Sequence, residues 1–147
     1  MRNRLALGVG LLAALAVAGW LVFRGQAPEE TVADGATLPA PDAIVPVKAP
    51  ARLDPLAAAG EKAFNAVCAA CHGPLAAGRK GKGPPLVHPY YRPGHHADEA
   101  FFRAVAMGVR AHHWTFGDMP PQSGLTPADV KAIVAYVRAL QRANGIC

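Results

Sequence analysis

Three residues near the middle of the chain, Cys68, Cys71 and His72, have side chains whose spacing suggests a specific chemistry. Their pattern, C-x-x-C-H, places two thiols three positions apart and an imidazole directly after the second thiol. Such thiols can form a redox-active pair, supply half of a zinc site, or attach a haem covalently. These chemistries need different surroundings, so the rest of the chain must distinguish them.

The surroundings of the motif favour covalent haem attachment. A redox-active pair calls for a preceding strand and a longer α/β chain, whereas a zinc site calls for a second Cys or His pair at short spacing. The third cysteine, Cys147, does not supply such a pair and is expected to be a free, exposed thiol. Thiols three positions apart on a helical turn reach the two vinyl groups of one porphyrin, and the next imidazole lies under the iron. We therefore expect one haem c, covalently bound through Cys68 and Cys71, with His72 as an axial ligand.

Residues 56–146 resemble class I cytochromes c, and several motifs follow that family's order. Gly60 and Phe64 lie one helical turn apart ahead of the haem motif, as does a Gly/aromatic pair that the family packs against its C-terminal helix. The resemblance implies an all-α domain of about three helices around one covalent haem. It also implies electron transfer as the activity.

The same resemblance implies two further contacts to the haem iron or its ligand. Gly83-Pro84-Pro85-Leu86 resembles the family's Gly-Pro-x-Leu, in which the proline carbonyl accepts a hydrogen bond from the proximal histidine. Here the carbonyl of Pro84 would accept a hydrogen bond from Nδ1 of His72 and so make that ligand more basic. Met119-Pro120 resembles the Met-Pro that supplies the sixth ligand, and its prolines hold the loop extended. Met107, in a helical segment, is expected to serve as packing material.

Five histidines follow the haem motif, and they depart from the plainest family pattern. Three interpretations stay open: polar residues on the surface or beside the haem propionates, a histidine as the sixth ligand, or a copper site built from the two His-His pairs, since imidazole suits copper. The five residues are His88, His95, His96, His112 and His113.

Three helices are expected, over about residues 54–70, residues 98–109, and from Thr126-Pro127 to Asn144-Gly145. Thr126 can cap the last helix, because proline suits the first helical position and glycine a helix end. That helix shows one apolar stripe with Tyr136 at its flank. No strand pattern is present. The side chains expected to line the haem are Leu86, Phe101, Phe102, Val105 and Ile133, with Trp114 and Tyr90 or Tyr91 either facing the haem or on the surface.

The N-terminal part has a different character. Residues 5–23 form an uncharged apolar run that would span about 28 Å as a helix, close to the thickness of a bilayer core. We expect residues 1–24 to be an uncleaved signal anchor or a cleaved signal peptide, and either would export the remainder. Prolines interrupt residues 25–52, which are expected to be a semi-rigid linker to the cytochrome c domain at residues 53–147.

The net charge of the domain and the expected ligands of the haem iron indicate the class of function. Residues 52–147 hold eleven basic and six acidic residues, so the whole net charge of +5 lies there. This favours acidic redox partners and, in an exported protein, makes nucleic acid an unexpected partner. His/Met ligation leaves no open iron position, so we expect an electron carrier without enzymatic activity or small-molecule substrate. It would work at the inner membrane, facing the periplasm, or as a soluble periplasmic protein if cleaved. The alternatives are a haem c subunit of a larger oxidase or dehydrogenase, and a periplasmic haem- or copper-handling protein.

Overall fold

The first helix of the domain is set by its capping residues. The computed structural model describes residues 40–147, and in it helix α2 (Pro55–Val67) follows Asp54, whose carboxylate accepts a hydrogen bond from the amide of Ala57 at 2.8 Å. Proline suits the first turn because that turn leaves its amides unpaired. Cys68 ends α2, and the short helix α3 (Ala69–His72) follows directly. The C-x-x-C-H motif therefore lies on a helical turn, as predicted.

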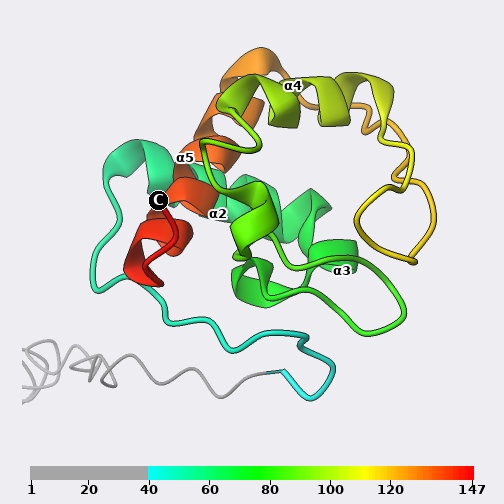
Figure 1. The fold of residues 1–147 in the computed structure, drawn as a ribbon. Coiled ribbons are helices and arrows are strands. Elements are labelled where there is room, and N and C mark those ends of the chain that lie inside the picture. Colours follow the sequence, from blue (N-terminus) through cyan, green and yellow to red (C-terminus); the bar gives the residue numbers. More distant parts are fainter. Residues whose placement is uncertain (1–39) are drawn as a thin grey trace, which may run out of the picture. The chain divides into compact units, whose positions relative to one another are not determined.

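Two further helices, α4 (Asp98–Met107) and α5 (Pro127–Ala143), complete the domain (Figure 1). Helix α4 has two acidic residues in its first turn, where their negative charges interact favourably with the positive end of the helix dipole. Helix α5 begins with a capping box, in which Thr126 and Asp129 bond each other's backbone amides. The predicted helices are confirmed, apart from shifts of a few residues at their ends. Short 3₁₀ turns, η1 (Pro74–Ala76) and η2 (Pro89–Tyr91), lie in the connection between α3 and α4.

Close packing of α2 against α5 forms the centre of the core. A Cβ atom on Gly60 would lie 1.8 Å from the carbonyl oxygen of Ala132, so only glycine permits this backbone approach. One turn later the rings of Phe64 and Tyr136 pack with their centroids 5.5 Å apart. Tyr136 is buried at the centre rather than at the flank of the stripe, where the sequence placed it, because it faces α2.

No strand occurs within residues 40–147, which agrees with the expected all-α class. Two isolated bridges are present, Arg79 with Gly83 and Val109 with Met119. Each holds a loop in place beside the haem motif or the Met-Pro motif. The fold is thus mostly helical, with long loops whose shape depends on a few backbone contacts.

The described part of the expected linker, residues 40–52, contacts the domain. The amides of Ile44 and Val45 donate hydrogen bonds to the carbonyl of Ala77, and Lys48 exchanges backbone hydrogen bonds with the Asn144 side chain. The expected apolar segment at residues 5–23, and with it the anchor or signal, lies outside the described residues. Among residues 40–147, no helix has the length and apolar character needed to cross a bilayer.

Candidate haem-binding site

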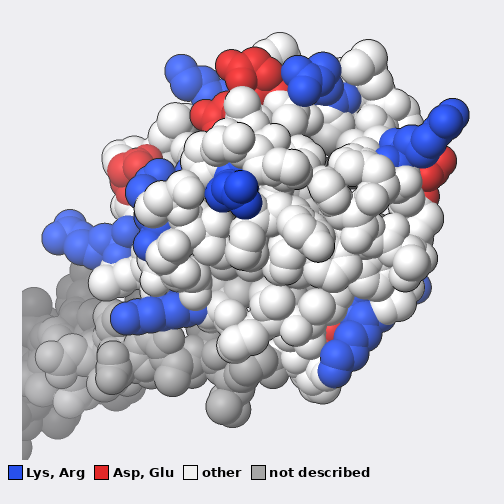
Figure 2. Space-filling view, viewed as in Figure 1, with Lys and Arg blue, Asp and Glu red and all other residues white. Residues whose placement is uncertain are grey.

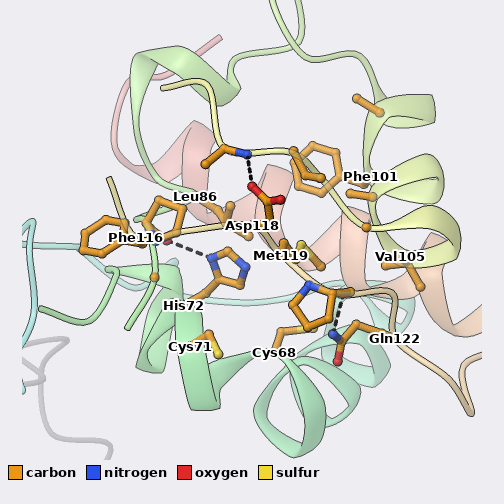
Figure 3. A pocket seen from close by; sticks show the side chains of 18 of the residues that line it. Cys68, Cys71, His72, Leu86, Phe101, Val105, Phe116, Asp118, Met119 and Gln122 are labelled. Carbon is orange, nitrogen blue, oxygen red and sulfur yellow. Dashed lines mark hydrogen bonds between the residues drawn. The ribbon is translucent and has the colours of Figure 1, made fainter. Parts of the chain in front are cut away.

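One large cavity opens beside the C-x-x-C-H turn (Figure 3). Its volume is about 630 Å³, and most of its lining side chains are apolar. Helices α2 and α3 form one wall, α4 and the following loop form another, and Val130 and Ile133 contribute from α5. The site residues predicted from the sequence, Cys68, Cys71, His72, Pro84 and Met119, all line this cavity.

His72 has the tautomer and charge that an iron ligand requires. Its Nδ1 lies 2.8 Å from the carbonyl oxygen of Pro84. Since a carbonyl can only accept, Nδ1 carries the proton and Nε2 keeps its lone pair. Burial lowers the pKa of His72, although the hydrogen bond to Pro84 opposes this shift. The structure therefore contains the His72–Pro84 contact that the resemblance implied, with a neutral imidazole that can bind metal.

The two thiols of the motif lie on the same helical turn and are not joined by a disulfide. Cys68 is half-buried, whereas Cys71 is exposed. Burial, and then the nearby Cys71, raise the pKa of Cys68 to about 11. A redox-active thiol pair depends on a thiol whose pKa lies below its ordinary value. The environment of Cys68 is therefore unsuited to thioredoxin-like chemistry.

Backbone hydrogen bonds hold Met119 at the cavity. Met119 and Val109 exchange two N–H···O bonds of 2.9 Å each, which join the loop to the end of α4. Close approach requires glycine at position 108, because a Cβ there would lie 2.5 Å from the carbonyl oxygen of Met119 and φ is +75°. Asp118 accepts a hydrogen bond from the amide of Ala111 at 2.8 Å (Figure 3). The amide of Gln122 donates to the carbonyl of Val105 at 2.8 Å, so the loop is attached to the chain on both sides of Met119.

Most of the other side chains that were expected to line the haem do line this cavity. Leu86, Phe101, Val105, Ile133, Tyr91 and Trp114 line the cavity. Phe102 does not, because one residue along a helix turns a side chain by about 100°; it lies at a small separate pocket with Asp98 and Arg138. Met107 is 67 % exposed, so it is not the packing residue that the sequence suggested. It lies at the margin of the same cavity.

Arg138 is a positioning residue that the sequence analysis missed. It is 7 % exposed and bonds Asp98 at 2.8 Å. Its other guanidinium nitrogens donate to the carbonyls of Tyr91 and His96, at 2.7 and 2.6 Å. These bonds attach the segment before α4 to α5 and so set one edge of the cavity. A signal was present, because Arg138 follows Val134 by four residues and therefore shares the apolar face of α5.

Polar groups at the margin of the cavity fit the acidic groups of a haem. Lys82, Arg103 and Arg110 are among the lining residues, and haem propionates are carboxylates. The indole N–H of Trp114 is buried and has no hydrogen-bond partner among the described residues. A buried donor without an acceptor costs about 1–3 kcal/mol, which a bound carboxylate would recover. The mainly apolar interior, the two thiols and this margin therefore suit haem.

Comparison with protein families identifies the chain. The family model described as Cytochrome c matches residues 57–141, more than half of the sequence. The chain belongs to the cytochrome c family. It is accordingly a haem-based electron-transfer protein that binds haem c. Comparison with curated proteins and with solved structures gave no match.

Proposed function

We propose that this cytochrome c domain is a single-haem electron carrier, with the haem attached through Cys68 and Cys71 and the iron bound by His72 and Met119. The observation that supports this most is the shared cavity: the only C-x-x-C-H motif of the chain and the Met-Pro loop line the same space. One motif of this kind corresponds to one covalent haem.

Bound haem c supplies a one-electron iron couple, and the residues around it adjust that couple. His72 presents Nε2 while Pro84 holds its other nitrogen, which fixes the orientation of the ring. Met119 offers a thioether on a loop that two backbone bonds hold in place. A thioether ligand raises the reduction potential, and the apolar lining excludes water. Two protein ligands leave no iron position for a substrate, so the proposal is a carrier rather than an enzyme.

The haem content tests this proposal directly. A pyridine haemochrome assay combined with protein quantification should give one haem c per chain, and acid-acetone should leave that haem on the protein. The double variant Cys68→Ser/Cys71→Ser should carry no covalent haem. Haem that extracts into acid-acetone, or a haemochrome typical of haem b, contradicts the attachment. A redox-titrated visible spectrum should fit a single one-electron transition.

Location is proposed from the sequence alone. The apolar run of residues 5–23 follows Arg2 and Arg4, an arrangement that favours a cytoplasmic N-terminus and an exported haem domain. We propose retention as an anchor at the inner membrane, because the run continues past a potential cleavage site at Ala16-Val17-Ala18 through Trp20. The native protein should stay with membranes after a carbonate wash. An N-terminus at Gly19 and a soluble periplasmic protein contradict this.

Acidic redox proteins are proposed as partners because of the net charge of the domain. Of the basic residues after the haem motif, Lys80 and Lys82 are exposed, whereas Arg79 pairs with Asp42 at 2.7 Å. Figure 2 shows basic side chains spread around the visible face rather than gathered in one patch. Steering should therefore be modest, and the double variant Lys80→Gln/Lys82→Gln should reduce the salt dependence of electron transfer. An unchanged salt slope excludes these lysines from docking.

A further inference from the structure

Three histidines from two separate segments converge near the haem cavity. His95 and His96 precede α4, whereas His113 lies in the loop between α4 and α5. One ring nitrogen from each lies within 4.8 Å of those from the other two. We call these three residues the histidine cluster. His96 and His113 also line the haem cavity, and His95 is exposed to solvent, so a small ion could enter from outside.

The spacing of the nitrogens suits one shared ion. Nε2 of His95 lies 3.4 Å from Nε2 of His113. Two nitrogens bound tetrahedrally, each about 2.0–2.1 Å from the metal, would be about 3.3–3.4 Å apart. At this separation the two rings also form a long hydrogen bond. Little movement of the rings would therefore be needed for both nitrogens to bind one ion.

Hydrogen bonds at the far side of the rings also suit metal binding. Nδ1 of His96 donates to the carbonyl of Tyr90, which leaves Nε2 as a lone-pair donor. Metal-binding histidines commonly have such an outer partner, which fixes the tautomer and the ring orientation. His112 has the same arrangement, with Nδ1 2.9 Å from the carbonyl of Arg110. The centroid of its ring lies 4.2 Å from that of His113, but His112 is not among the three residues whose nitrogens converge.

We propose that the histidine cluster binds one divalent transition-metal ion, Zn²⁺ or Cu²⁺, separate from the haem iron. The ligands are imidazoles, and no carboxylate among the described residues joins the group, which favours these ions over Mg²⁺ or Ca²⁺. The ion would join the segment before α4 to the loop that continues to Met119. The site therefore goes beyond electron transfer by a haem domain, and its occupancy would restrain the cavity edge that Arg138 also holds.

Calorimetric titration of the full-length, haem-loaded protein with ZnCl₂ and with CuCl₂ tests the site. The Cys147→Ser background removes the terminal thiol as a competing ligand, and haem attachment occupies the other two thiols. We expect one equivalent of metal. The variants His95→Gln and His113→Gln should each weaken binding by at least about tenfold. His88→Gln is the matched control, because His88 lies nearby yet accepts a hydrogen bond from Tyr90 through Nδ1 and is not in the cluster.

Each result of the titration either supports the metal site or overturns it. Binding of one equivalent that depends on His95 and His113 but not on His88 supports the site, and the paramagnetic resonance spectrum of bound Cu²⁺ should then show coupling to imidazole nitrogens. No binding of either ion overturns the proposal, as does binding that survives both variants. If the variants change the haem spectrum and no metal binds, the cluster serves the haem instead. Each result is independent of whether the haem domain is a carrier.

Discussion

Replacing Gly60 by alanine should destabilise the domain, although alanine is the better helix former. In an isolated helix this change would stabilise by about 1 kcal/mol. In the domain, the added Cβ would lie 1.8 Å from the carbonyl oxygen of Ala132 and 2.9 Å from the amide nitrogen of Ile133. These are backbone atoms of α5, which cannot turn aside as the end of a side chain can.

The size of the effect follows from the separation that α2 and α5 would need. A carbon and an oxygen in contact are normally about 3.3–3.6 Å apart, so the helices must part by about 1.5 Å. A gap of that size forfeits much of the dispersion energy between Phe64 and Tyr136. Overpacking usually lowers the free energy of unfolding by about 1–3 kcal/mol. Because the atoms that clash here belong to the backbone of α5, we expect Gly60→Ala to cost about 3 kcal/mol. The melting temperature should fall by about 10 °C or more.

Urea denaturation of the haem-loaded protein, followed by helical circular dichroism, measures this loss. Gly94→Ala is the matched control, because a Cβ there meets nothing within 4 Å and the backbone needs no positive φ. That variant should stay within about 0.5 kcal/mol of the parent. If Gly60→Ala is as stable as the parent, or more stable, helix propensity outweighs packing and the described approach of α2 and α5 is wrong.

Three further predictions concern individual side chains. Met119→Ala should abolish the weak long-wavelength absorption band of Met-ligated ferric haem, whereas Met107→Ala should keep it; the reverse result would assign the sixth ligand to Met107. Arg138→Met should cost about 3 kcal/mol in denaturant unfolding, because it leaves the His96 carbonyl and the side-chain oxygen of Gln141 without their donor, whereas the Tyr91 carbonyl keeps its hydrogen bond from Gln141. Asp98→Asn should cost about 1 kcal/mol or less, since the Asp98 side chain is 56 % exposed. If both variants lose the same free energy of unfolding, the stabilisation comes from the Arg138–Asp98 ion pair rather than from the bonds to the carbonyls. The exposed thiol of Cys147 should remain free, so the haem-loaded protein should run as a monomer on a non-reducing gel; a dimer that Cys147→Ser removes would show that the thiol pairs between chains.

Local features of the sequence were sufficient to predict the helices and the haem motif. The helix starts are encoded within a few residues, as at Thr126, Pro127 and Asp129, because capping and proline geometry act over one turn. The C-x-x-C-H spacing likewise acts within a single helical turn, so Cys68 and His72 could be assigned without a fold. The positions of the remaining site residues followed from the resemblance, not from local chemistry.

Only the tertiary structure decided which distant segments meet. Arg138 occupies an apolar face in the sequence, and its role is visible only once the carbonyls of Tyr91 and His96 lie beside it. Phe102 was placed at the haem because a repeat of apolar residues does not specify which neighbour turns inward. The two His-His pairs offered several interpretations until the fold brought His95 and His113 within 3.4 Å. Residues eighteen positions apart carry no local signal of contact, because loop conformation depends on packing against the whole domain.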